Sequence, residues 1–151
     1  MANTFRLKII TPSSVKFDEE VLSILTNTSE GKVEILANHA SIVINTVQAI
    51  TVVTKADGEK VELFTARGLI GFKDNELDFC CGSCETKDEI DVERAKAAKE
   101  RAEKRLKEDQ YDKERATAAL RRALIRLQLK NKYLSLISFM ANLWQSITKK
   151  A

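Results

Sequence analysis

Hydrophobic and polar residues alternate along the first half of the chain. Phe5, Leu7 and Ile9 fall on one side of an extended segment, and the basic residues between them fall on the other. Runs rich in β-branched residues recur in VLSILTNT, SIVINTV and AITVVT, as expected for half-buried strands. The spacing predicts roughly eight to ten short antiparallel strands that close into a sandwich or a barrel.

Turn-forming residues are confined to the same half. Every glycine and the only proline lie within the first 82 residues, so nothing after Gly82 interrupts a helix. Asp57-Gly58 separates two apolar runs and supplies the positive φ angles of a tight hairpin, and Asp74-Asn75 predicts a second turn.

The second half has the period of helices, with a predicted break near residues 109–112. Asp91 and Asp112 each stand where a side-chain oxygen caps a helix start. Small residues repeat at matching offsets on both predicted helices: Ala95, Ala98, Ala102 and Leu106 on the first, and Ala116, Ala119, Ala123 and Leu127 on the second. Such stripes let two antiparallel helices pack closely but bury little area, so we expect a marginal hairpin that can open.

The two halves also differ in charge. Residues 1–87 hold nine Lys and Arg against twelve Asp and Glu, a net of −3, whereas residues 88–151 hold sixteen against ten, a net of +6. This asymmetry indicates two different partners. The start MANTFRLKII lacks the features of a secretory leader, and no stretch supplies the roughly 20 apolar residues of a membrane span, so we expect a cytosolic chain.

Arginines form one row on each predicted helix. Arg94, Arg101 and Arg105 share offsets of 0, 7 and 11 with Arg115, Arg122 and Arg126, so each set follows one helical line. Like charges four residues apart repel unless something neutralises them. An anion such as a phosphate would do so, with Asp91 offering an acceptor to a ribose or adenine. The alternative is a solvated surface of weak salt bridges with neighbouring glutamates.

The stretch from Ile90 to Ala95, IDVERA, resembles the I/L-D-x-x-R-A motif of the epsilon subunit of bacterial F-type ATP synthases. The RAxxALRRAxxRL pattern from Arg115 to Leu127 adds to the similarity, as do the TP of KIITPS, the SEG triplet and the segment from Ile35 to Ala40. These motifs span about residues 4–130 and are specific in combination.

The resemblance implies an α+β chain, with a ten-stranded β-sandwich over residues 1–87 and an antiparallel two-helix hairpin over residues 88–151. Family members are non-catalytic subunits in the central stalk of a proton- or sodium-translocating rotary motor, at the cytoplasmic face of the cell membrane. The sandwich binds the gamma subunit and the c-ring. The hairpin either folds against the sandwich or extends into the alpha/beta catalytic head, where it blocks ATP hydrolysis. ATP favours the folded hairpin in several members, so ATP is the expected regulatory ligand, with no required cofactor, metal or nucleic acid.

The same resemblance assigns residues to roles. The implied nucleotide ligands are Ile90, Asp91, Arg94, Ala95, Arg101, Arg122, Arg126 and Glu85, and the implied subunit contacts are Glu30, Gly31, Lys32 and His39. The chain departs from the family's GxLGILPGHA stretch, because GKVEILANHA places Ala37-Asn38 where a Pro-Gly is usual, and Arg67-Gly68 replaces a common Gly-Gly.

The C-terminal segment is a larger departure, because most members lack it or keep it short and polar. Tyr133, Leu136, Ile137, Met140, Leu143, Trp144 and Ile147 would form one apolar helical face. Three interpretations are open: a helix extension that packs on this protein or its gamma partner, a lengthened inhibitory arm, or association with a membrane surface.

Three cysteines lie within five residues, an odd number that favours free thiols in a reducing compartment. Cys81-x-x-Cys84 allows a zinc ligand pair, a redox pair or simply buried thiols, and the only histidine, His39, is far away in sequence. The alternative function is a basic helical-hairpin module for nucleic acid or another anionic partner, although the first helix offers no aromatic side chain on which a base can stack.

Overall fold

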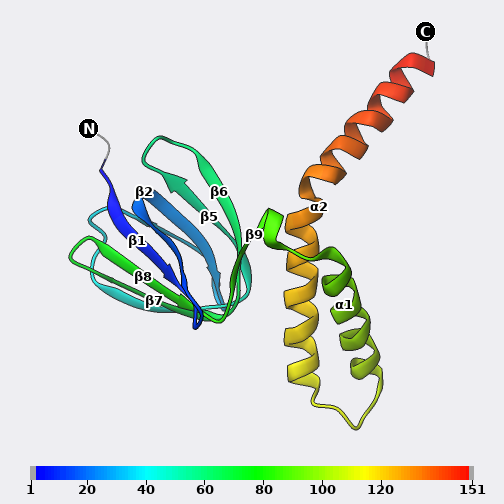
Figure 1. Ribbon diagram of the computed structural model, residues 1–151, viewed down its shortest axis with the longest axis horizontal. Coiled ribbons are helices and arrows are strands. Elements are labelled where there is room, and N and C mark those ends of the chain that lie inside the picture. Colours follow the sequence, from blue (N-terminus) through cyan, green and yellow to red (C-terminus); the bar gives the residue numbers. More distant parts are fainter. Residues whose placement is uncertain (1–2, 150–151) are drawn as a thin grey trace. The chain divides into compact units, whose positions relative to one another are not determined.

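The computed structural model describes residues 3–149, which form two compact units dividing between Glu89 and Ile90. In its described part the first unit contains nine strands and a short 3-10 helix, η1 (Lys87–Glu89) (Figure 1). The strands are β1 (Phe5–Ile10), β2 (Val15–Thr28), β3 (Gly31–Leu36), β4 (Ile42–Thr46), β5 (Ala49–Lys55), β6 (Lys60–Thr65), β7 (Gly68–Lys73), β8 (Glu76–Cys81) and β9 (Cys84–Thr86).

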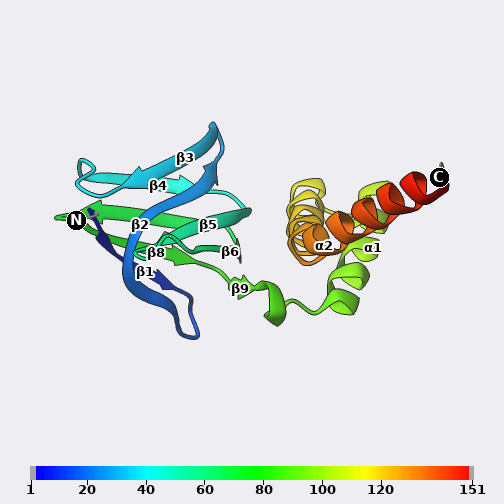
Figure 2. The same cartoon turned by 90° about the horizontal axis from the view of Figure 1, so that it is seen from above.

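The strands form one sheet that folds over into two layers. Its order is β4-β7-β8-β1-β2-β5-β6-β9, and β3, outside this order, also pairs with β2. The long strand β2 joins the layers, because its first half pairs with β1 while its second half pairs with β3 and β5. Figure 2 shows how strongly β2 curves between these pairings.

The predicted sandwich is confirmed, with two differences. Nine strands stand within the described residues where about ten were expected, and one pair, β1 with β8, is parallel. The paired residues of β1 and β8 lie about 70 positions apart in the chain. The pair is parallel because β8 follows β7 in the sheet and then lies beside β1. Sequence alternation gives the buried face of each strand but not its partner.

The core lies between the two layers. Alternate residues of β1 and β8 point inward and are buried, as the period of two requires. The largest fully buried side chains of this unit are Phe5, Phe64, Phe79, Leu7, Ile9, Ile24, Ile35, Ile70 and Leu77.

Both predicted turns are present. Gly58 has a φ of 89° in the loop between β5 and β6. Asp74 and Asn75 have φ angles of 51° and 61° between β7 and β8, the left-handed pair of a type I′ turn. Asn38 likewise has a φ of 62°, a left-handed conformation that asparagine tolerates better than most residues.

The second unit is the predicted hairpin of two helices, α1 (Val92–Lys107) and α2 (Lys113–Lys149). Asp91 Oδ1 accepts a hydrogen bond from the amide of Arg94 at 3.0 Å. Asp112 Oδ1 accepts from the amides of Glu114 and Arg115 at 2.9 and 3.2 Å. Both predicted caps are therefore confirmed.

The second helix is much longer than the first. With 37 residues against 16, α2 continues beyond the part that α1 can cover, since both rise about 1.5 Å per residue. The apolar face predicted for residues 133–147 lies outside the described side chains. No helix among the described residues is long and apolar enough to cross a membrane.

Candidate functional site

The two helices meet along a seam of alanines. Ala95 and Ala102 on α1 and Ala116 and Ala123 on α2 are buried, each pair seven residues apart. The other members of the predicted stripes, from Ala98 to Leu127, are half-buried. A seven-residue spacing keeps one face of a helix toward its partner over two turns. The seam confirms the predicted close packing, and its four buried residues are all alanines.

The arginine rows stand at the same angle from this seam on both helices. At about 100° per residue, Arg94 lies about 100° behind Ala95, and Arg115 lies about 100° behind Ala116. On two antiparallel helices, side chains at the same angle from the shared seam point to the same side of the hairpin. This is because reversing one helix also reverses the direction in which that angle increases. The sequence therefore brings both rows to one face.

An open hollow of about 640 Å³ lies on this face near the turn. The lining residues are Arg105, Tyr111, Asp112, Arg115, Ala116, Ala118, Ala119 and Arg122. Arg105 Cζ stands 5.5 Å from the centroid of the Tyr111 ring, a cation–π distance. Of the residues predicted to bind nucleotide, Arg122 alone lines this hollow.

The other predicted ligands are spread along the hairpin. Ile90 and Ala95 are buried, Arg94 and Arg101 are exposed, and Arg126 is half-buried. Among described residues, Asp91 uses one carboxylate oxygen as the cap of α1, which leaves the other available to a ligand. Glu85 belongs to β9 in the first unit.

Five of the six arginines in the two rows have no carboxylate partner among the described residues. Within the described part of the chain, no ion pair involves the guanidinium groups of Arg94, Arg101, Arg105, Arg115 or Arg122. Two ion pairs on the hairpin instead join Lys99 with Glu103 and Lys113 with Asp109, at 3.7 and 3.8 Å. For these five arginines, the alternative of weak salt bridges with neighbouring glutamates is not observed among the described residues.

The predicted subunit contacts fall at opposite ends of β3. Glu30 and Gly31 stand at the exposed turn where β3 begins, followed by Lys32. His39 follows the other end, where its ring meets the edge of Phe72 at 5.9 Å between centroids. Six strand residues separate these ends by about 20 Å, so the two groups are separate surfaces.

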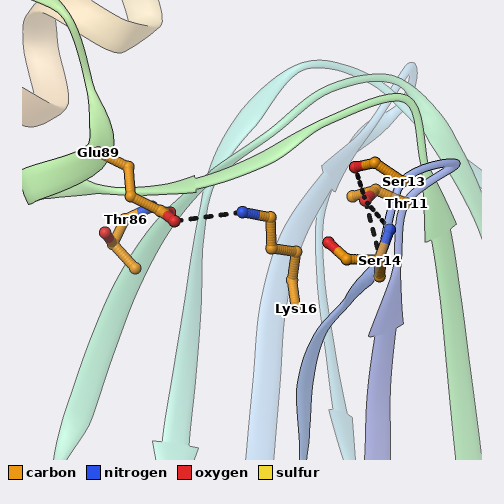
Figure 3. Close-up of polar contacts among 6 residues, drawn as sticks. All are labelled: Thr11, Ser13, Ser14, Lys16, Thr86 and Glu89. Carbon is orange, nitrogen blue, oxygen red and sulfur yellow. Dashed lines mark hydrogen bonds and ion pairs between the residues drawn. The ribbon is translucent and has the colours of Figure 1, made fainter.

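The segment that leads into the hairpin is held by Glu89. Its carboxylate accepts a hydrogen bond from the Thr86 amide at 2.8 Å and pairs with Lys16 Nζ at 3.2 Å (Figure 3). Both contacts lower the pKa of Glu89. Nearby, Thr11 closes the β1–β2 turn by its hydroxyl, which donates to Ser14 O at 3.0 Å. The ion pair spans 73 residues, so no sequence pattern indicated it.

The thiols are divided by burial. Cys81 and Cys84 are buried in the sandwich, whereas Cys80 is exposed. Burial raises the pKa of Cys81 to about 11 and that of Cys84 to about 12, which keeps both protonated and unreactive. The described residues hold no cluster of three groups suited to a metal.

Two family matches cover most of the chain. Residues 4–87 match the family described as ATP synthase, Delta/Epsilon chain, beta-sandwich domain, and residues 88–131 match its long alpha-helix domain. The matched regions stop at residue 131, before the C-terminal part of α2.

Individual relatives agree with these matches. The ATP synthase epsilon chain of Clostridium acetobutylicum is 41% identical over 107 residues, 71% of this chain and 80% of that one. The epsilon chain of Clostridium botulinum strain Eklund 17B is 47% identical over 108 residues, 72% and 81% of the two chains. A chain of the Euglena gracilis mitochondrial ATP synthase shares the fold, with a TM-score of 0.63, 22% identity, and coverage of 91% of this chain and 82% of that chain. The chain therefore belongs to the delta/epsilon family of ATP synthase subunits, as an epsilon chain, a non-catalytic subunit of the central stalk.

Proposed function

We propose that residues 1–87 couple the c-ring to the gamma subunit, and that residues 88–151 restrain ATP hydrolysis in the alpha/beta head. The enzyme would be a proton- or sodium-translocating ATP synthase, with this subunit peripheral on the cytoplasmic face of the membrane. The family membership supports the assignment of the sandwich. For the hairpin, the supporting observation is the pair of arginine rows on one face, of which Arg94, Arg101 and Arg122 form no ion pair among the described residues.

ATP is the ligand that best fits these rows. Its phosphates carry several negative charges, and guanidinium forks match phosphate oxygens in pairs. The second carboxylate oxygen of Asp91 can accept from a ribose hydroxyl or the adenine amino group. Arg94 and Arg101 from α1 would meet the phosphates together with Arg122 and Arg126 from α2. Glu85 is carried over from the family resemblance alone.

Ligand binding would then control whether the hairpin is closed. Phosphates bridge the two rows only while the helices lie together, so ATP stabilises the closed state by its differential affinity. The seam opposes opening weakly, because each buried methyl group contributes only about 0.8 kcal/mol. Repulsion between the arginines favours opening when the ligand leaves.

The opened helix would present a basic surface to the catalytic head. Residues 112–132 contain seven Lys and Arg and two Asp and Glu, a net of +5. Such a helix is attracted to acidic surfaces, and charge complementarity chiefly accelerates and orients the encounter.

Titration of the isolated chain with ATP tests the ligand. Arg122→Gln should weaken binding at least tenfold, whereas Arg121→Gln removes the same charge one residue away and should change it less than twofold. Arg121 is exposed and points away from the seam, about 140° from Ala116. Equal losses in the two variants, or no saturable binding by the wild type, would refute the proposed ATP site.

The inhibitory role is tested in the assembled enzyme. Deleting residues 88–151 should raise ATP hydrolysis at low ATP concentration while leaving the subunit in the complex. An unchanged hydrolysis rate would exclude inhibition by the hairpin. Loss of the truncated subunit from the complex would instead place an assembly role in the helices.

A further inference from the structure

The hollow near the turn of the hairpin gathers arginines from both helices. Arg105 comes from the last turn of α1, Arg115 from the first turn of α2, and Arg122 from two turns further along. Asp91 and Arg94, which carry the family motif, do not line it. The hollow thus shares Arg122 with the ATP ligands proposed above, whereas Arg105 and Arg115 lie outside that set.

The charged side chains that line the hollow are mostly basic. Three guanidinium groups and the Asp112 carboxylate line it, a net of 3 − 1 = +2. Asp112 directs one oxygen to the amides of Glu114 and Arg115, so that oxygen is already engaged in capping α2. None of the three arginines forms an ion pair within the described part of the chain.

The placement of Arg115 opposes the stability of its own helix. A cation in the first turn lies beside the positive end of the helix dipole, which costs a few tenths of a kcal/mol. Arg105, in the last turn of α1, has the favourable placement, and its guanidinium is also positioned over Tyr111. A bound anion between them would compensate Arg115 and join the two helix ends.

We propose that this hollow binds a phosphate-bearing anion through Arg105 and Arg115, with Arg122 shared with the ATP site proposed above, so that binding here does not require Asp91 or Arg94. Three planar guanidinium groups suit the several oxygens of a phosphate better than the two of a carboxylate. A volume of about 640 Å³ leaves room for pyrophosphate. The anion is either free or the phosphate chain of a nucleotide, and both present the same chemistry to the arginines.

Calorimetric titration of the full chain with pyrophosphate and, separately, with ATP tests the site at constant ionic strength. Replacing Arg105 and Arg115 together by glutamine should weaken binding at least tenfold. The matched control is the double change Lys104→Gln and Arg121→Gln, which also removes one cation from each helix. Neither control residue lines the hollow, and both are exposed. The control should change affinity less than twofold, and circular dichroism would verify equal helicity in all variants.

The ligands and one further variant separate the sources of the anion. Saturable pyrophosphate binding that depends on Arg105 and Arg115 supports a free anion. Binding of ATP alone, with the same dependence, supports the phosphates of a nucleotide. The proposal is overturned if neither ligand binds saturably, or if the control pair weakens binding as much as the hollow pair does. Arg94→Gln should weaken ATP binding yet leave pyrophosphate binding within twofold, so this site and the ATP site proposed above can fail separately.

Discussion

The two units of the chain bury very different side chains. The sandwich buries Phe5, Phe64 and Phe79 completely, together with many leucines and isoleucines. The hairpin, in its described part, buries mainly alanines. Full burial of a large side chain contributes about 1.5–3 kcal/mol, against about 0.8 kcal/mol for a methyl group. From this difference we expect the sandwich to be the more stable unit and the packing of the hairpin to be the weaker one.

The hydrogen bonds of the sandwich and of the hairpin also differ in how far apart in the chain their partners lie. Inside the sandwich the hydroxyl of Thr51 is hydrogen-bonded to those of Thr26 and Thr65, at 2.8 and 2.7 Å, and all three residues are buried. These bonds cross from β2 through β5 to β6 and so connect distant parts of the chain. In the hairpin, the hydrogen bonds of Asp91 with Arg94, of Lys113 with Leu106 and of Thr117 with Lys113 join residues at most seven apart. Local contacts of this kind can break without disturbing the scaffold.

The largest expected effect comes from emptying the sandwich core. Phe79→Ala should lower the free energy of unfolding by about 3–5 kcal/mol, because Phe79 is 0% exposed and its loss leaves a cavity. Urea unfolding followed by amide signals from β1 and β8 would report this loss. Leu124→Ala is the control on α2, since Leu124 is 44% exposed and should cost under about 1 kcal/mol. Equal losses of unfolding free energy in the two variants would show that the sandwich and the hairpin unfold together, which would contradict their division into two units.

A close backbone approach in β7 gives the next largest effect. A Cβ on Gly68 would stand 2.2 Å from the carbonyl oxygen of Cys80 and 2.8 Å from the Cα of Cys81. Gly68→Ala should therefore destabilise the sandwich by about 1–3 kcal/mol, measured by thermal unfolding. Gly71→Ala, in the same strand, meets nothing within 4 Å and provides the control. Similar losses at both positions would point to a general cost of alanine in β7.

Local patterns predicted much of what the structure contains. The alternation at Phe5, Leu7 and Ile9 gave the buried face of β1, because a strand has only two faces. The turn at Asp74-Asn75 followed from residues that tolerate positive φ. The seven-residue spacing of buried alanines gave the helix seam, and the equal offsets of the arginines followed it.

Contacts between residues far apart in the chain could not be predicted from the sequence. The parallel pairing of β1 with β8 depends on how two layers close, which no local pattern encodes. The ion pair between Lys16 and Glu89 is a second contact of this kind, between two single side chains. The hollow at the turn was also missed, because Tyr111 and Arg105 come together only through the length of the loop. One signal was present, since Arg105 lies four residues before the predicted break at residues 109–112 and Arg115 lies three residues after it.

Removing a cap should affect the hairpin and spare the sandwich. Asp112→Ala leaves the amides of Glu114 and Arg115 without their acceptor, so α2 should lose about 1 kcal/mol at its start. The helical circular dichroism signal should melt earlier, while amide signals of the sandwich keep their midpoint. Asp109→Ala removes an equal charge from the loop without removing a cap, and its exposed pair with Lys113 contributes little. A matching shift in both variants would assign the effect to charge.

The smallest expected effect tests how the scaffold holds the segment leading into the hairpin. Glu89→Gln keeps an acceptor for the Thr86 amide but removes the charge that faces Lys16. The pKa of Glu89 is lowered in the folded chain, so its charge stabilises the fold above the unfolded value of about 4.3. This stabilisation is lost as pH falls through the lower folded pKa.

At pH 7 the variant should therefore unfold at a slightly lower temperature than wild type. Its free energy of unfolding should fall by at most about 1 kcal/mol, because the ion pair is so exposed. Below the folded pKa the two melting curves should coincide, because the wild-type carboxyl is then neutral as well. Repeating the comparison in a Lys16→Met background should remove most of the difference at pH 7, since the partner charge is gone. A difference that persisted in acid would mean that the amide of glutamine fits the Thr86 contact poorly and that the ion pair with Lys16 contributes nothing. The segment before Ile90 would then be held by its hydrogen bonds alone.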